Sequence, residues 1–381
     1  MSDVRALRVL VIEDSETNRR LLDALLRAAG IQTIAFAVDG IDGLEKVESF
    51  QPDLVVLDIM MPRMDGFEVC RRLRALPEHR SLPILVQTGL ETAQERTEAF
   101  RAGATDLVIK PLNGAEFLAR VRVHLQNRML IRDLEDYRAR LEGELVVARD
   151  MQQSLLPTES LMDEISASHG LRIAAHFEPC SELGGDGWGL ADLGDGRVAV
   201  WLVDFTGHGV GAAVNTFRLH TLMSEMPPDP SDPARYLAAL NARLCGLLRI
   251  GQFATFLYGI LDTRAHVFTY AGAAGTSPVI GDADGMAAHD ASGLPLGISR
   301  HGTWQNHSVP FPPGSLLLLY SDALTETLDT QGAMLDEPAV TVLAADSRRA
   351  EEPLTALLEV FHRDREPVSD DLTLVWIERT G

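Results

Sequence analysis

Four short apolar segments in the first 111 residues each end on a reactive side chain, and this arrangement strongly constrains the fold. The segments are rich in Val, Ile and Leu and end at Asp14, Asp58, Thr88 and Lys110. Because helical patterns separate them, they indicate buried parallel strands of a doubly wound α/β sheet. Ligands of such sheets bind outside the carboxyl ends of the strands. We therefore expect these side chains, together with Glu13, to meet in one crevice.

The five side chains in this predicted crevice suit phosphoryl transfer to an aspartate. Neighbouring carboxylates repel one another unless a cation is present, and the oxygens of Glu13, Asp14 and Asp58 suit Mg²⁺. Asp58 would then be the nucleophile that accepts a phosphoryl group. Lys110 and the metal would hold the equatorial oxygens, and the Thr88 hydroxyl would bond the phosphorylated product. The alternative is a set of unrelated surface carboxylates.

This part of the chain resembles the receiver domain of bacterial response regulators. The resemblance covers about residues 7 to 125 and includes the motifs IED, LDIMMPRMDGFE, QTG and IKP. It implies that a histidine kinase donates the phosphoryl group to Asp58. It also implies that the carbonyl of Met60 joins Asp14 and Asp58 on Mg²⁺, with Glu13 close by. Leu107 stands where receivers usually carry a switching Tyr or Phe. The resemblance therefore does not extend to the coupled movement of a hydroxyl side chain and an aromatic side chain that is usual in receivers.

A long helical pattern without proline follows, from Glu116 to Leu155, and Pro157 ends it. Apolar residues in its middle are spaced alternately by four and three positions, and the series continues with a one-residue offset near Glu144. They are Leu130, Leu134, Tyr137 and Leu141, followed by Leu145 and Ala148. This spacing favours a short coiled coil with a stutter, which would make the protein a homodimer. The alternative is an amphipathic helix that packs on one of the domains.

The remaining residues, 158–381, have a different pattern, in which strand-like segments follow one another and helices occur in separate blocks. This order predicts an α+β layered fold. Four of its segments place aspartates at turns or strand ends, namely LGGDGWG, WLVDFTGHG, LYSDALTE and SDDLTLVW. Taken singly, each has an ordinary explanation as a turn, a helix N-cap or a solvated pair. Taken together, dispersed aspartates without a cysteine or histidine cluster suit hard cations such as Mg²⁺ or Mn²⁺.

These motifs resemble the metal-dependent protein phosphatases (PPM, type 2C) of the SpoIIE branch. The similarity runs from about Ala148 to Glu378 and includes ARDMQQSLLP, GGD, DFTGHG, ASGLPLGI, YSDALTE and DDLTLV. It implies two central β-sheets flanked by helices, and a protein serine/threonine phosphatase that uses two Mn²⁺ or Mg²⁺ ions. The implied ligands are the bridging carboxylates of Asp186 and Asp204, the carbonyl of Phe205, and the carboxylates of Asp322 and Asp370. Asp371 is the less favoured choice at the last motif.

Three positions near these motifs need separate comment. His208, in TGHG, could act as a general acid, but we favour a structural role in capping a helix. Gly189 stands where many relatives carry another aspartate, and Gly275 replaces the usual histidine of a glycine-rich turn. Neither glycine belongs to the implied ligand set, although both departures could alter substrate positioning or metal affinity.

Bulk composition limits the functions that such a chain can have. The 381 residues leave room for two or three domains, and we expect a receiver domain over 1–125, a helical linker over 126–157 and a phosphatase domain over 158–381. The net charge of −21 argues against binding to nucleic acid or anionic membranes. The three cysteines are not clustered, and the longest aliphatic stretch, SLLLLYS, is too short to span a bilayer. With no cleavable apolar segment at the N-terminus, we expect a cytoplasmic protein.

The combined reading is a two-component response regulator in which phosphorylation of Asp58 controls a protein phosphatase. By resemblance, the expected substrate is a phosphorylated anti-sigma-factor antagonist, a small STAS-type domain. The alternative is a non-enzymatic adaptor, gated by phosphorylation, that binds a sigma factor or an anti-sigma partner. Degenerate phosphatase folds of that kind lose the metal aspartates, whereas all four motifs are present here. A DNA-binding output has little support, because acidic residues interrupt the arginine-rich stretch from Arg120 to Arg140.

Overall fold

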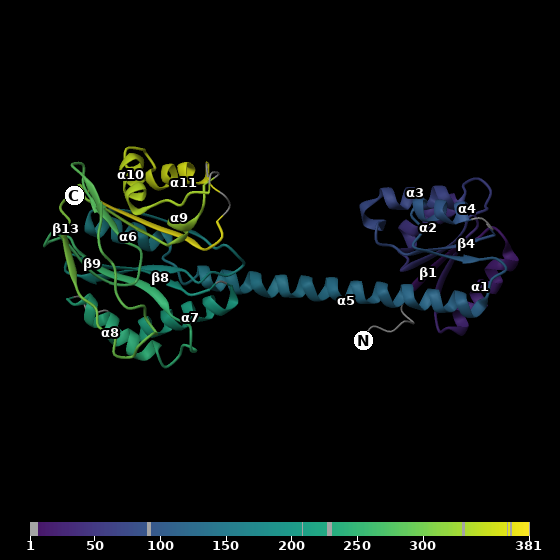
Figure 1. The fold of residues 1–381 in the computed structure, drawn as a ribbon, viewed down its shortest axis with the longest axis horizontal. Coiled ribbons are helices and arrows are strands. Elements are labelled where there is room, and N and C mark those ends of the chain that lie inside the picture. Colours follow the sequence, from purple (N-terminus) through teal and green to yellow (C-terminus); the bar gives the residue numbers. More distant parts are fainter. Residues whose placement is uncertain are drawn as a thin grey trace. The chain divides into compact units, whose positions relative to one another are not determined.

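The computed structural model of the chain describes residues 7–89, 93–207, 209–226, 231–329, 332–363, 365 and 368–380. The chain divides into two compact units, Met1–Glu142 and Gly143–Gly381 (Figure 1). Each unit has its own sheets and its own buried core. Among the described residues, none of the helices combines the length and the apolarity that a membrane span requires.

The first unit is built on a five-stranded parallel sheet of order β2-β1-β3-β4-β5. Its strands are β1 (Arg8–Ile12), β2 (Thr33–Ala37), β3 (Leu54–Asp58), β4 (Ile84–Thr88) and β5 (Asp106–Ile109). The connecting helices are α1 (Glu16–Ala28), α2 (Gly40–Phe50), α3 (Gly66–Ala75), the short 3-10 helix η2 (Pro77–His79) and α4 (Ala93–Ala102). This strand order is that of the flavodoxin-like doubly wound fold, which confirms the predicted architecture.

Local sequence explains where these helices begin. Ser15, Asp39 and Asp65 stand at the N-caps of α1, α2 and α3, and each side chain accepts a hydrogen bond from a backbone N–H of the first turn. Apolar side chains of the strands fill both faces of the sheet and contact two separate groups of helices. The polar groups that follow the strands are therefore held at one edge of a rigid sheet.

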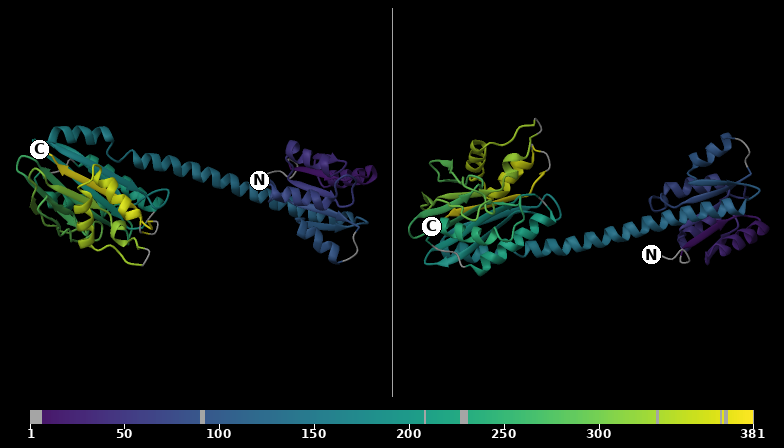
Figure 2. Two further views of the ribbon diagram at one scale, coloured as in Figure 1. Left: turned by 90° about the horizontal axis from the view of Figure 1, so that it is seen from above. Right: turned by 60° about the horizontal axis from the view of Figure 1, so that its bottom comes forward.

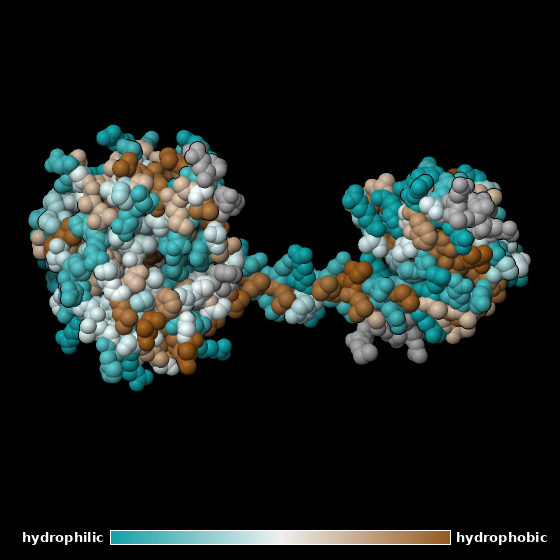
Figure 3. All heavy atoms as spheres, viewed as in Figure 1, coloured by the Kyte–Doolittle hydropathy of each residue, from teal (hydrophilic) through white to brown (hydrophobic). Residues whose placement is uncertain are grey.

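Helix α5 (Gly114–Gln153) continues from the first unit into the second as one helix of 40 residues, close to the predicted range. Four of the predicted coiled-coil positions are exposed in the single chain, whereas Leu145 and Ala148 are partly buried. Figure 3 shows hydrophobic side chains on the surface along this helix. Leu130, Leu134 and Tyr137 expose 63%, 65% and 58% of their surface, and Leu141 exposes 40%. Among the described residues, no other element of the chain covers this stripe. The boundaries at residues 125 and 157 stay a prediction.

The second unit contains two five-stranded antiparallel sheets, as the predicted layered fold requires. The first sheet has the order β13 (His307–Pro310), β10 (Val267–Ala273), β9 (Ala254–Asp262), β8 (Arg197–Phe205) and β7 (Gly187–Gly194). The second has the order β12 (Met286–Ala288), β11 (Val279–Gly281), β14 (Leu316–Tyr320), β15 (Leu372–Arg379) and β6 (Leu171–Glu178). Apolar residues of both sheets share one core, so the sheets pack face to face.

Helices cover the outer faces of this sandwich (Figures 1 and 2). Helices α7 (Val210–Glu225) and α8 (Pro233–Leu244) pack on the first sheet, and α10 (Glu337–Ser347) and α11 (Pro353–Arg363) pack on the second. Helix α6 (Glu159–His169) lies against β6, and the short α9 (Ala323–Glu326) follows β14. The predicted arrangement of two sheets flanked by helices is confirmed.

Strand β7 was not predicted, and its packing explains why its sequence is unusual. It contains several glycines, which seldom occur inside strands. Gly189 lies directly opposite Trp201 of β8, and a Cβ atom at this glycine would stand 2.1 Å from the indole ring. Trp201 therefore occupies the space beside the strand that a larger residue would need. The absence of an aspartate at this position has a steric reason in this chain.

Candidate functional site

The first acidic centre lies at the carboxyl ends of β1 and β3. Glu13 and Asp58 are buried, Asp14 is exposed, and one carboxylate oxygen from each lies within 4.8 Å of the others. The sheet brings them together because β1 and β3 are adjacent parallel strands. Three oxygen donors at this spacing form a set that suits Mg²⁺.

Lys110 supplies a positive charge inside this centre. Its Nζ lies 2.9 Å from an Asp58 oxygen and 3.1 Å from a Glu13 oxygen. Burial raises the pKa of Asp58 and repulsion from Glu13 adds to this, although hydrogen bonds from Lys110 and from the backbone N–H of Met60 oppose the change. Burial alone would lower the pKa of Lys110, but its contacts with the two carboxylates raise it on balance. The lysine therefore stays charged between the two acids.

The remaining predicted receiver residues lie around the same edge. Thr88 ends β4 and is buried, and its carbonyl accepts a hydrogen bond of 2.8 Å from the backbone N–H of Lys110. Met60 contacts Asp58 through its backbone, while its side chain is exposed. Leu107, which lies on β5 opposite Val86 of β4, is partly buried. The structure thus gathers at this edge all five side chains that the strand ends predicted.

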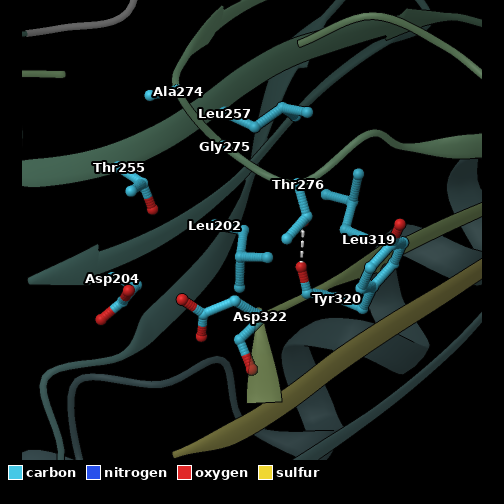
Figure 4. Close-up of a pocket in the computed structure, with 11 residues that line it drawn as sticks. Leu202, Asp204, Thr255, Leu257, Ala274, Gly275, Thr276, Leu319, Tyr320 and Asp322 are labelled. Atoms are coloured by element: carbon cyan, nitrogen blue, oxygen red, sulfur yellow. Dashed lines mark hydrogen bonds between the residues drawn. The ribbon is translucent and has the colours of Figure 1, made fainter. Parts of the chain in front are cut away.

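The second acidic centre lies in the C-terminal unit, and widely separated segments contribute to it. Asp186 precedes β7, Asp204 lies near the end of β8, Asp322 precedes α9 and Asp370 precedes β15. Electrostatic repulsion links Asp204 with Asp186, Asp322 and Asp370, and it also links Asp322 with Asp370. The four predicted aspartates therefore lie within range of one another's charge, although no three of their carboxylates bring oxygens within 4.8 Å of one another. Figure 4 shows Asp204 and Asp322 on one side of a pocket that Thr255, Gly275 and Thr276 also line.

The electrostatics of this centre call for bound cations. Burial raises the pKa of Asp186 well above its usual value, and repulsion from Asp204 adds to this. Burial and the charges of Asp322 and Asp370 raise the pKa of Asp204 to about 8, and burial with the charge of Glu326 raises that of Asp322 to about 6. Among the described residues, no ion pair joins these aspartates to a lysine, arginine or histidine. An all-oxygen donor set of this kind, with Asp186 buried and the other three aspartates partly buried, fits hard divalent cations.

Asp370 and Asp371 differ in what their oxygens already bind. Asp371 is buried, and its carboxylate accepts hydrogen bonds from the backbone N–H groups of Cys180 (2.8 Å), Gly185 (2.5 Å) and Asp186 (3.4 Å). Asp370 is partly exposed and accepts one bond of 2.8 Å, from the N–H of Asp371. Asp371 therefore holds the GGD turn in place, whereas Asp370 has more free capacity for a cation. This supports the predicted preference for Asp370.

The glycines of the GGD motif permit close packing at the centre. A Cβ at Gly184 would stand 2.6 Å from a carboxylate oxygen of Asp371, and one at Gly185 would stand 2.8 Å from the carbonyl oxygen of Phe205. The Phe205 carbonyl, one of the predicted ligands, thus lies beside the GGD turn. The Thr373 hydroxyl donates a 2.5 Å hydrogen bond to Asp186 and fixes this carboxylate.

Gln152, near the end of α5, was not predicted as a site residue. It is buried, its Nε2 donates to the carbonyl of Gly184 at 2.7 Å, and its Oε1 accepts from the N–H of the same residue at 3.1 Å. Nearby, Arg149 donates to the carbonyl of Glu182 at 2.9 Å. The last turns of α5 are therefore bonded directly to the segment that carries Asp186. The QQSLLP motif was the available signal, but it did not reveal the amide pairing.

Asp322, His208 and Gly275 were also singled out in this region. Asp322 stands at the N-cap position of α9, yet its side chain makes no capping hydrogen bond, which weakens the explanation as an ordinary cap. His208 lies outside the described residues. Gly275 lines the pocket beside Thr276, whose hydroxyl donates to the carbonyl of Tyr320 (Figure 4).

Sequence models of two families match the chain. That of the response regulator receiver domain matches residues 9–122, and that of stage II sporulation protein E (SpoIIE) matches residues 194–380. The chain joins a receiver domain to a SpoIIE-family domain. The SpoIIE match contains three of the four converging aspartates and begins after Asp186. Both resemblances inferred from the motifs are thus confirmed.

Curated relatives are similar to this chain in the receiver domain. Response regulator PleD of Caulobacter vibrioides is 37% identical over 132 residues, which cover 35% of this chain and 29% of PleD. Response regulator MprA of Mycobacterium ulcerans is 42% identical over 125 residues, covering 33% of this chain and 53% of MprA. The chain thus spans between about a third and a half of the length of these relatives.

A solved structure shares the fold of the C-terminal unit. The SiaA-PP2C domain of Pseudomonas aeruginosa superposes with a TM-score of 0.55 at 20% identity, covering 64% of this chain and 98% of that domain. The second unit therefore has the fold of a type 2C phosphatase domain.

Proposed function

We propose that this protein is a response regulator whose receiver, phosphorylated at Asp58, controls a metal-dependent protein serine/threonine phosphatase. The observation that carries the proposal is the proximity of Asp186, Asp204, Asp322 and Asp370 in a partly buried centre that has no basic partner among the described residues. Four neighbouring carboxylates without a counter-charge, of which Asp186 is buried and the other three are partly buried, are unfavourable by themselves, and divalent cations would remove this cost.

The residues of the second centre have distinct parts in the proposed hydrolysis. Asp186, Asp204, Asp322, Asp370 and the Phe205 carbonyl would together hold two Mn²⁺ or Mg²⁺ ions. A bound pair of such ions supplies a nucleophilic water and a positive clamp for phosphate oxygens. Thr373 orients Asp186 through its hydrogen bond, and Asp371 holds the backbone of the GGD turn. No covalent intermediate with the protein is needed.

A hydrolysis assay tests this proposal. We expect the full-length protein to hydrolyse p-nitrophenyl phosphate only when Mn²⁺ or Mg²⁺ is present. Asp186→Asn should lower the rate by at least about 100-fold. Even the loss of a group that only supports a metal ligand lowers metal affinity or activity by about 10- to 100-fold. Asp284→Asn, at an exposed aspartate of the same unit, is the matched control and should keep the activity. Hydrolysis that does not depend on metal, or no hydrolysis by any of the proteins, would favour the non-enzymatic adaptor.

In the first centre, Asp58 would accept a phosphoryl group from a histidine kinase. Glu13, Asp14, Asp58 and the Met60 carbonyl would hold Mg²⁺, while Lys110 and Thr88 would bind phosphoryl oxygens. The support is the cluster of three carboxylates within 4.8 Å and the contacts of Lys110 with two of them. The added phosphoryl charge can then reorganise the receiver surface.

Helix α5 would transmit this change, since it makes defined contacts within each unit. In the first unit, Arg120 and His124 bond Asp106, which begins β5, at 2.6 and 3.1 Å. In the second, Gln152 bonds Gly184 beside Asp186. Typical coupling energies of about 1–3 kcal/mol correspond to a graded change of roughly 5- to 150-fold in the phosphatase rate.

The coupling can be measured with an acyl-phosphate mimic. We expect beryllofluoride bound at Asp58 to change the rate of the full-length protein within this range. Gln152→Ala should reduce that change, whereas Gln153→Ala, at the neighbouring position of the helix, should preserve it. Equal rates with and without beryllofluoride in the wild type would remove the coupling, while leaving the phosphatase itself intact.

The exposed apolar stripe of α5 would pair two copies of the chain. Its four residues, Leu130, Leu134, Tyr137 and Leu141, keep the spacing of four and three that coiled coils use. Leu134→Glu should shift the mass measured by light scattering from dimer to monomer. Arg138→Glu, at an exposed position of the helix outside the stripe, is a control for charge.

The substrate would be a phosphoserine or phosphothreonine protein, and by family resemblance an anti-sigma-factor antagonist of the STAS type. A metal-loaded Asp186→Asn variant that binds without hydrolysing could retain such a protein from cell extract. Recovery of a phosphorylated STAS-type domain would support this substrate. Recovery of a different phosphoprotein would exclude this substrate but leave the phosphatase proposal standing.

A further inference from the structure

A cluster of two histidines and one glutamate lies in the C-terminal unit, outside both acidic centres. His176 and Glu178 belong to β6, and His362 belongs to the last turn of α11. One ring nitrogen of each histidine and a carboxylate oxygen of the glutamate all lie within 4.8 Å of one another. We propose that these three side chains form a binding site for a divalent transition ion of the zinc class.

The positions of the three residues follow from the fold. Residues two apart on a strand point to the same side of the sheet. His176 and Glu178 pair with Leu374 and Leu372 of β15, and both leucines contact the apolar face of α11. The histidine and the glutamate therefore face α11. Thr373, which bonds Asp186, points to the opposite side, so the cluster is separate from the acidic centre.

The distances agree with those expected around a zinc ion. The Nε2 atoms of His176 and His362 lie 3.1 and 3.5 Å from the same oxygen, Oε2, of Glu178. With metal–ligand bonds of about 2.0–2.1 Å in tetrahedral geometry, neighbouring ligand atoms stand about 3.4 Å apart. Two imidazoles and one carboxylate also form a donor set that suits zinc better than Mg²⁺, which prefers oxygen. Because the three side chains are partly exposed, a water can take the fourth position.

A metal at this place would tie together two segments that lead to the acidic centre. Glu178 stands two residues before Cys180, whose N–H bonds Asp371. His362 stands eight residues before Asp370. The ion would join the end of β6 to the end of α11, and we expect it to stabilise the folded C-terminal unit.

Zinc binding to the full-length protein tests the site directly. The affinity is measured by competition with a chromophoric zinc chelator, in excess Mg²⁺ so that oxygen-rich sites are occupied. We expect the His362→Ala variant to bind one zinc ion fewer, or to bind that ion with an affinity lowered by more than about 100-fold, since a direct ligand is lost. His301→Ala, at an exposed histidine of the same unit, should titrate like the wild type.

A thermal readout guards against misfolding of a variant. Zinc should raise the melting temperature of the wild type and of His301→Ala, and it should do so much less for His362→Ala and Glu178→Gln. Both variants change partly exposed side chains, so their zinc-free melting temperatures report whether they fold. If all four proteins bind the same number of zinc ions with the same affinity, the cluster is only a pair of histidine–glutamate contacts and the proposal is wrong.

Discussion

The two acidic centres of this protein differ in how their negative charge is balanced. In the receiver, Lys110 stands within 3.1 Å of both buried carboxylates, Glu13 and Asp58. In the SpoIIE-family domain, no described basic side chain pairs with Asp186, Asp204, Asp322 or Asp370. The comparison teaches that the first centre has its own counter-charge and can keep its shape without metal. The second has no such counter-charge among the described residues, and in the proposed hydrolysis divalent cations would supply it.

The largest expected effect distinguishes these two chemistries. Asp58→Asn should abolish phosphoryl uptake from acetyl phosphate in the presence of Mg²⁺, because no nucleophilic carboxylate remains at the end of β3. Retardation in a phosphate-affinity gel measures the uptake. Asp23→Asn, at a partly exposed position of α1, should be labelled like the wild type. Stable label in Asp58→Asn would place the covalent chemistry elsewhere and break the comparison.

A steric change in the GGD turn should produce the next largest effect. In Gly185→Ala the added methyl group would stand 2.8 Å from the Phe205 carbonyl oxygen, so the turn and this predicted ligand cannot keep their positions. We expect metal-dependent hydrolysis to fall by at least about 10-fold, as for the loss of a supporting contact around a metal. The control is Gly211→Ala, where the added methyl group meets open space. Activity above half of the wild-type rate would show that the close approach is unimportant.

Removal of metal should expose the charge imbalance of the second centre. The pKa of Asp204 is raised from 3.8 to about 8, so the folded protein binds a proton that the unfolded chain releases. The stability of the metal-free protein should therefore fall as pH rises from about 4 to 8. Calorimetry in EDTA should show this fall, and Mn²⁺ should reverse it. At pH 8, Asp204→Asn should raise the melting temperature by at least about 2 °C. A metal-free stability independent of pH would contradict the imbalance.

Asp106, a paired carboxylate of the receiver, should give the smallest effect, and its contribution to stability should depend on pH with the opposite sign. Burial opposes ionisation of Asp106, but hydrogen bonds from Arg120 and His124 leave its pKa below the usual value. Its stabilising contribution is therefore present above pH 4 and is lost as the pH falls through the lowered pKa. Arg120→Ala should cost only about 0.5 kcal/mol, because this arginine is partly exposed. Arg20→Ala, which breaks a fully exposed ion pair of α1, should cost less, and thermal melting compares the two.

The sequence predicted those features that depend on local patterns. The receiver strands are continuous apolar segments, so their order and the residues at their ends followed from a known topology. Helix α5 was predicted within two residues at each end, since no proline interrupts it. The four motif aspartates could be assigned to one centre only through family resemblance, because residues 186 to 370 are far apart in the chain and no local pattern shows that they meet.

Other features depend on contacts that one sequence does not contain. Strand β7 looks like a turn because it is rich in glycine; its pairing with β8 makes it a strand, and the indole of Trp201 explains the glycine at position 189. The roles of Asp370 and Asp371 differ only in the backbone N–H groups around them. The pairing of Gln152 with Gly184 joins residues 32 positions apart. Similarly, His362 lies far in sequence from His176 and Glu178.

Anomalous diffraction at the manganese edge, from crystals of the full-length protein grown with Mn²⁺, tests the central claim most directly. The account predicts two adjacent peaks between Asp186, Asp204, Asp322 and Asp370. A peak beside Asp14 and Asp58 in the receiver would serve as an internal reference for metal loading. A loaded receiver site with no peak among the four aspartates would contradict the claim that they converge to bind cations.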